Sequence, residues 1–76
     1  MEIGTILAAA RKRAQLTQRE LAQRLGISAT YLSDMEQGRR AFGEKFLDDL
    51  PPDIRAEVRP AFIAEYEAAI ARLNGC

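Results

Sequence analysis

Apolar side chains recur every three or four positions along most of this 76-residue chain, with polar side chains between them. Residues with this spacing lie on one face of an α-helix and can be buried together. No stretch alternates apolar and polar residues in the manner of a β-strand, and no internal repeat is present. The pattern therefore predicts an all-α fold built from short amphipathic helices.

The first predicted helix spans about residues 2–14. Its apolar positions have the spacing of one helical face. They are Ile3, Ile6, Leu7, Ala10 and Ala14. Arg11 lies four residues after Leu7, so we expect its side chain to border this apolar face.

Two short helices joined by a tight turn are predicted next. Thr17, followed three residues later by Glu20, has the spacing of a capping box and should begin a helix over QRELAQRL. Gly26 should end it, because glycine adopts the left-handed conformation common at helix C-termini. Ser28 is the expected N-cap of a second helix over about 29–37. This arrangement is typical of a helix-turn-helix.

The inward positions of this pair are apolar and are expected to form part of the core. They are Leu21, Ala22, Leu25, Ile27, Leu32 and Met35. Glu36 follows on the inward side of the second helix, which predicts an acidic side chain at the edge of the core.

A short helix is predicted at 43–50, with Phe46, Leu47 and Leu50 as its inward side chains. One or two further helices are predicted after it. Pro51 and Pro52 interrupt the chain there. Pro60 should break or kink any helix that runs through it. Residues 52–73 therefore form either one kinked helix or two, which gives five or six helices in total.

The composition excludes several classes of protein. A chain of this length supports one small domain of marginal stability, to which oligomerisation could add. Its only cysteine is Cys76 and it has no histidine, which excludes a zinc finger and a His-based catalytic site. No nucleophile–base pair or phosphate-binding loop is present. We therefore expect no enzyme activity, no cofactor and no metal.

The chain also lacks the sequence features of membrane and secreted proteins. No apolar run approaches membrane-spanning length. The N-terminal stretch MEIGTILAAARKRAQL carries its basic charges after the apolar residues, whereas a signal peptide carries them before. We therefore expect a soluble cytoplasmic protein that makes no membrane contact.

The charges are unevenly distributed although the net charge is zero. Residues 1–45 hold eight basic and five acidic side chains, whereas residues 46–76 hold three basic and six acidic ones. The first part can therefore present a basic face suited to nucleic acid. The same asymmetry is also compatible with an unevenly charged solvated surface.

The segment LTQRELAQRLGISATYLSDMEQGRR resembles the helix-turn-helix of the Cro/phage-repressor superfamily, also called the XRE family. The resemblance is close over 16–40 and follows the helix order over 2–50. It rests on Gln18 at the start of the motif, Ala22 where the helices cross, Gly26 in the turn and the EQGRR ending.

This resemblance implies a compact bundle of the lambda-repressor-like DNA-binding type, with the helix-turn-helix at helices 2 and 3. It implies a DNA-binding core over 1–50. The C-terminal helical extension over 51–76, which departs from the common pattern, is expected to pack as part of the same single domain and to dimerise.

The resemblance also implies which residues meet double-stranded DNA, with the helix over 29–37 in the major groove. The base-reading candidates are Ala29, Thr30, Tyr31, Ser33 and Asp34. The phosphate candidates are Thr17, Gln18, Ser28, Arg39 and Arg40. Lys12, Arg13 and Lys45 are further candidates for the basic face. For Gln18, Arg39 and Arg40 the alternative is an ordinary solvated side chain.

The base-reading candidates include no arginine to form a bidentate contact with guanine. Ala29 and the methyl group of Thr30 can contact thymine methyl groups, and Asp34 can accept a hydrogen bond from cytosine N4. We therefore expect affinity to come from Gln18, the two arginines and dimerisation. Specificity should come from methyl contacts, water and DNA shape.

In members of this family the positions of Arg11 and Glu36 form a partly buried ion pair that ties the first helix to the third. The resemblance therefore implies a structural role for these two residues. Removal of one partner would leave a buried charge.

The last segment carries an apolar stripe that is large for so small a core. Its members are Phe62, Ile63, Tyr66, Ile70 and Leu73. We expect the stripe to form a homodimer contact, and the alternative is that it folds back on the first and fourth helices of its own chain.

The expected function is that of a homodimeric repressor, of phage or mobile-element type, that binds a palindromic operator and can repress its own promoter. The alternative is an antitoxin-like DNA-binding protein whose C-terminal helix binds a partner protein. No small-molecule ligand is expected, because 76 residues leave no room for a separate sensing domain.

Overall fold

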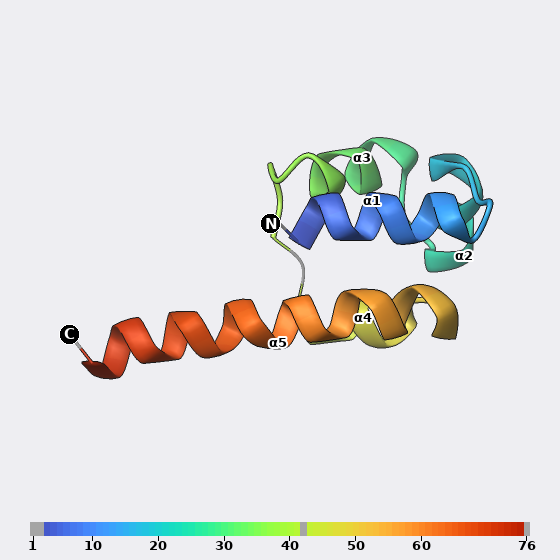
Figure 1. Cartoon of the computed structure of the whole chain (residues 1–76). Helices are drawn as coiled ribbons and strands as arrows, with labels where there is room; N and C mark the ends of the chain where they lie inside the picture. Colours follow the sequence, from blue (N-terminus) through green and yellow to red (C-terminus); the bar gives the residue numbers. More distant parts are fainter. Residues whose placement is uncertain (1–2, 42, 76) are drawn as a thin grey trace.

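The computed structural model describes residues 3–41 and 43–75, without the side chains of residues 66 and 69–75. Five helices and no strand form this part of the chain (Figure 1). They are α1 (Ile3–Arg13), α2 (Gln18–Leu25), α3 (Ala29–Glu36), α4 (Glu44–Asp49) and α5 (Pro52–Gly75). The prediction of an all-α fold is confirmed, and the alternative with one helix over 52–73 is correct.

Local hydrogen bonds explain why α2 begins at Gln18. The amide of Glu20 donates to the Thr17 hydroxyl over 3.0 Å, and the amide of Thr17 donates to the Glu20 carboxylate over 2.9 Å. This reciprocal pair is the predicted capping box. It satisfies two backbone donors at a helix start that would otherwise lack partners.

The turn between α2 and α3 also forms as predicted. Gly26 has a φ of 71°, in the left-handed region that glycine adopts without steric cost. The amide of Ile27 then donates to the carbonyl of Ala22 over 3.0 Å, which closes the end of α2. Ser28 caps α3, since its hydroxyl accepts a 3.0 Å hydrogen bond from the amide of Tyr31.

Every helix contributes to one apolar core. Its buried members are Leu7, Ala10, Leu21, Ala22, Leu32, Met35, Leu47, Leu50, Ile54 and Val58. The sequence pattern missed Ile54 and Val58 of α5, which are fully buried. The first half of α5 is therefore part of the core, and α1 lies between α3 and α5 (Figure 1).

Gly4 sets how closely α1 approaches α3. A Cβ atom at this position would lie 2.5 Å from the carbonyl oxygen of Met35 and 2.6 Å from that of Glu36. Both neighbours are backbone atoms, which cannot turn aside as a flexible side chain can. Only glycine therefore permits this contact between the two helices.

Helix α5 runs through Pro60 without interruption, so of the two expected effects of this proline, a break or a kink, the break does not occur (Figure 1). Proline lacks the N–H that would bond the carbonyl of Ala56 four residues earlier. Ala56 and Pro60 are both exposed, so water can reach that carbonyl. None of the described helices is both long and apolar enough to span a membrane.

The apolar stripe expected to dimerise is divided between two environments. Phe62 is half-buried and packs against the core of its own chain, which matches the alternative of folding back. Ile63 remains 42 % exposed. The side chains of Tyr66, Ile70 and Leu73 lie outside the described residues.

Candidate nucleic-acid interface

The N-terminal edge of α3 faces solvent. Ala29, Thr30 and Tyr31 are exposed, and Ser33 and Asp34 are half-buried. The opposite face of the same helix buries Leu32 and Met35 in the core. Helix α3 is therefore fixed by its apolar face while all the base-reading candidates remain accessible.

Tyr31 and Arg40 lie against each other beside this edge. The guanidinium carbon of Arg40 is 4.7 Å from the centroid of the Tyr31 ring. A guanidinium over an aromatic face is attracted by the negative charge of that face. The arginine is thereby held next to α3 although it lies in the segment after the helix.

Asp34 and Arg39 form a second pair at the same place. Arg39 Nη1 lies 3.6 Å from Asp34 Oδ1, and the amide of Arg39 donates to the carbonyl of Asp34 over 2.8 Å. The nearby guanidinium offsets the negative charge of Asp34, so the acid does not stand alone on the surface expected to meet phosphates. A base-reading candidate is thus linked to a phosphate candidate.

Gln37 joins the α3 surface although sequence reasoning did not select it. It is exposed, and its Nε2 donates to the Ser33 hydroxyl over 3.0 Å. Glutamine is among the residues that bind base edges well. Its position four residues after Ser33, on the same helical face, was the signal that could have identified it.

Arg11 and Glu36 form a buried ion pair between α1 and α3. Arg11 Nε lies 2.7 Å from Glu36 Oε2, and Arg11 Nη2 lies 3.2 Å from Glu36 Oε1. Arg11 Nη1 also donates to the carbonyl of Leu16 over 2.8 Å. Among the described residues no buried side-chain nitrogen or oxygen lacks a partner, so this charged pair is fully satisfied.

Gln18 joins the same network from the start of α2. Its Nε2 donates to Glu36 Oε1 over 2.9 Å. A carboxylate can only accept, so one amide hydrogen is directed to Glu36 and the second is left for another acceptor. The backbone amide of Gln18 also has no acceptor within α2, because it lies in the first turn.

Thr17 and Ser28, the two other phosphate candidates, serve as helix caps. Each is exposed, and each hydroxyl oxygen accepts a hydrogen bond from its helix, from Glu20 and Tyr31 respectively. A hydroxyl that accepts can still donate its hydrogen. Ser28 therefore retains a donor that a phosphate oxygen could accept, whereas the Thr17 hydroxyl would have to exchange its hydrogen bond with the Glu20 carboxylate for one to phosphate.

Comparison with known proteins places this geometry in a family. The family model described as a helix-turn-helix domain matches residues 2–50. The chain belongs to this family. The matched residues carry α1 to α4, with α2 and α3 as the two helices of the motif.

The helix-turn-helix protein is also similar to the "ImmF control region 10 kDa protein" of Bacillus phage phi105, with 47 % identity over 38 residues. The aligned part covers 50 % of this chain and 42 % of the phage protein, so the chain spans less than half the length of that relative. No solved structure gives a significant match.

Arg13 and Lys45 of the helix-turn-helix protein are paired with acidic side chains. Arg13 Nε lies 3.0 Å from Glu57 Oε2 of α5, and Lys45 Nζ lies 3.5 Å from Asp49 Oδ2 within α4. The hydrogen bonds from Arg13 lower the pKa of Glu57, and those to Glu57 raise the pKa of Arg13. Arg13 therefore links α1 to α5 at the surface, a contact that the sequence did not indicate.

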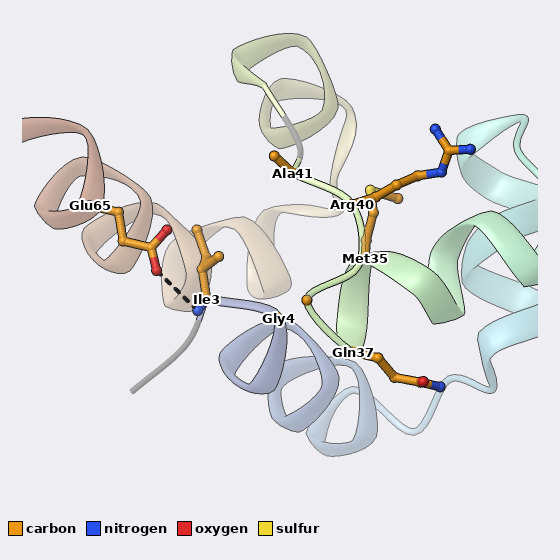
Figure 2. A pocket seen from close by; sticks show the side chains of 8 residues that line it. Ile3, Gly4, Met35, Gln37, Arg40, Ala41 and Glu65 are labelled. Atoms are coloured by element: carbon orange, nitrogen blue, oxygen red, sulfur yellow. Dashed lines mark hydrogen bonds between the residues drawn. The ribbon is translucent and has the colours of Figure 1, made fainter. Parts of the chain in front are cut away.

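A hollow of about 320 Å³ lies beside the end of α3, bordered by the start of α1, the segment after Gly38 and Glu65 of α5. Figure 2 shows Glu65 pointing toward the first turn of α1, where its Oε1 accepts a 3.3 Å hydrogen bond from the amide of Ile3. Arg40 and Gln37 also line the hollow. The end of α3, which carries the base-reading candidates, thus lies beside a hollow that the middle of α5 also borders.

Proposed function

We propose that this helix-turn-helix protein is a sequence-specific double-stranded DNA-binding transcriptional regulator. In this proposal α3 enters the major groove with its N-terminal edge toward the bases. The observation that carries the proposal is the exposed edge of α3 with Arg39 and Arg40 held beside it. A helix that can contact base edges, bordered by cations that can contact phosphates, is what recognition of a duplex requires.

Phosphate contacts are assigned to the residues around α3. Arg39 and Arg40 would exchange their intramolecular partners, Asp34 and Tyr31, for phosphate oxygens. Gln18 would donate through its second amide hydrogen while the first stays on Glu36. Thr17 and Ser28 would donate their hydroxyl hydrogens. These contacts would position α3 without selecting a sequence.

Base contacts are assigned to the edge of α3 itself. Ala29 and the Thr30 methyl group would meet thymine methyl groups, and Ser33 would donate to a base acceptor. Asp34, once released by Arg39, could accept from cytosine N4. Without an arginine bidentate to guanine, each base pair would contribute modestly and DNA shape would add to specificity.

We further propose that the protein is a cytoplasmic repressor that acts as a homodimer on a palindromic operator. The name of the phage relative refers to a control region, which supports a role in gene control. A repressor of this size would act by covering a promoter, including its own. The second candidate is an antitoxin-like protein with the same DNA-binding helices, favoured by the exposure of Ile63 on α5.

Replacement of Arg39 or Arg40 by alanine tests the phosphate contacts. Each change should weaken binding to operator and random duplexes alike. It should also lower the slope of log K against log salt by about one, because one phosphate contact is lost. Fluorescence anisotropy at several salt concentrations measures both quantities.

Arg24→Ala is the matched control, since it removes the same charge from an exposed position in the last turn of α2. Its salt slope should stay that of the unchanged protein. If the Arg39 and Arg40 variants had the same salt slope as Arg24→Ala and the unchanged protein, Arg39 and Arg40 would not contact phosphates.

A further inference from the structure

Helix α5 carries an apolar hollow on the face that points away from the core. The hollow has a volume of about 490 Å³. It is lined by Ala56, Arg59, Pro60, Ile63, Ala64 and Glu67. Among the described side chains only Tyr31 and Ile63 are large, apolar and exposed, and Tyr31 is covered in part by Arg40. Among the described residues, Ile63 is therefore the large apolar side chain with the highest exposure.

The two charged residues of the hollow lie symmetrically about Ile63. Arg59 precedes it by four residues and Glu67 follows it by four. At a rise of about 1.5 Å per residue, each charge lies about 6 Å along the helix from Ile63. Neither side chain has an ion-pair partner among the described residues.

We infer that a second copy of this chain docks on this face, with the two α5 helices antiparallel and a two-fold axis at Ile63. In this register Arg59 lies opposite Glu67 of the partner subunit, and Glu67 lies opposite the partner's Arg59. A two-fold contact repeats every interaction, so two ion pairs form in total, one on each side of the apolar centre. The small side chains of Ala56 and Ala64 allow the helices to approach closely.

Charge complementarity is the reason for choosing a second copy in this direction. A parallel pair of α5 helices would place Arg59 opposite Arg59 and Glu67 opposite Glu67, which is repulsive. The antiparallel pair turns both repulsions into attractions. The surface is thus complementary to itself.

The inference deepens the proposed homodimer and rests on it. It also changes which residues make the contact. Phe62 is occupied by the core of its own chain, whereas Ala56, Arg59 and Pro60 become part of the interface. The contact is centred on the outward face of α5, directly opposite the buried Ile54 and Val58.

Sedimentation velocity on Glu67→Arg and Arg59→Glu variants of the full chain tests this register. Either change replaces two attractions by two repulsions, so the dimer dissociation constant should rise about tenfold or more. The double variant R59E/E67R should recover the association of the unchanged chain. An equimolar mixture of the two single variants should also associate, because both ion pairs are restored in the heterodimer.

Arg19→Glu is the control, since it makes the same charge change on an exposed side chain of α2 and should leave association unchanged. Arg59 also borders a hollow with Glu44 and Asp48, so circular dichroism must show that R59E is folded. Should R59E fail to fold, E67R alone still tests the contact.

A pure chain that stays monomeric at all concentrations would overturn the inference, as would a Glu67→Arg variant that dimerises like the unchanged chain. Association of the double variant no better than that of the single variants would overturn the antiparallel register.

DNA binding by the monomeric E67R variant separates the two proposals. If it still binds random duplex through α2 and α3 while the dimer inference fails, the DNA-binding proposal stands.

Discussion

Three side chains that are far apart in the sequence meet where α1, α2 and α3 join. Arg11, Gln18 and Glu36 share one buried network, with Glu36 accepting from both of the others. Gln18 is also the phosphate candidate at the start of α2. The network therefore links the three helices and holds in place a residue proposed to bind DNA.

Arg11→Ala should destabilise the domain strongly. Among the described residues it leaves the buried Glu36 carboxylate with Gln18 as its only side-chain donor, and an unpaired buried charge costs about 3 kcal/mol or more. The free energy of unfolding in urea, followed by circular dichroism, measures the loss.

The double variant Arg11→Met with Glu36→Leu is the control, because removal of both charges leaves no buried ion and should cost much less than Arg11→Ala alone. A single variant as stable as the unchanged chain would show that the pair contributes nothing to the fold.

Individual residues differed in how far the sequence predicted them. The caps formed by Thr17, Glu20 and Ser28 are confirmed, because capping depends on neighbours within four residues. The role of Gly4 was missed, since its closeness to α3 is a tertiary contact that no local pattern encodes. The link from Gln37 to Ser33 is local, and the spacing of four residues on one helical face was a signal that could have identified it.

At the scale of helices, the beginning of α2 is stabilised by a charged side chain. Hydrogen bonds with Thr17, first from its backbone and then from its hydroxyl, lower the pKa of Glu20 below the ordinary value of 4.5. The folded state thus binds this proton less tightly than the unfolded chain does. The resulting stabilisation is complete above the unfolded pKa and is lost as the pH falls through the folded pKa.

Glu20→Gln should therefore remove a pH-dependent part of the stability. The neutral amide oxygen can still accept from the amide of Thr17, but it has no charge to lose. Thermal unfolding midpoints of the two proteins should differ most near neutral pH, with the unchanged chain more stable, and should converge as the pH falls below the ordinary pKa of a glutamate side chain. A difference that stays constant down to pH 3 would contradict the role assigned to the Glu20 carboxylate.

The continuity of helix α5 at Pro60 and the identity of its buried face could not be predicted from the sequence. Pro60 suggested a break, because proline removes one helical hydrogen bond, but that bond lies on the solvated face where water can replace it. Among the described side chains of α5, Ile54 and Val58 are fully buried, yet they lie before Pro60 and outside the apolar stripe that the sequence indicates. Which face of a long helix is covered depends on packing against α1, which the sequence pattern does not specify.

At the scale of the whole molecule, the two proposed surfaces lie on different helices. Helix α3 carries the candidate DNA surface and α5 carries the candidate dimer surface, with α1 between them (Figure 1). The uneven charge of the sequence agrees with this division, since residues 1–45 are mainly basic and residues 46–76 mainly acidic. Changes on the outward face of α5 should therefore leave the surface of α3 intact.

The helix-turn-helix itself was predictable from its periodicity, its caps and its turn glycine, and membership of the family is shown by the match over residues 2–50. The linkage of Arg39 to Asp34 and of Arg40 to Tyr31 was not. These pairs arise from the path of the chain after α3, where Gly38 has a φ of 80°. The pairing of Arg39 with Asp34 explains how an acidic residue can lie on a surface proposed to meet phosphates.

Quantitative footprinting of the purified protein on DNA upstream of its own gene tests the central claim most directly. The account predicts protection of a palindromic site whose half-sites lie about 34 Å apart on one face of the duplex. It also predicts tighter binding there than to random DNA at the same salt concentration. Equal affinity for the upstream DNA and for random DNA would contradict the proposal that α3 recognises a sequence. The absence of any protected site at protein concentrations high enough to saturate a DNA site would also contradict it.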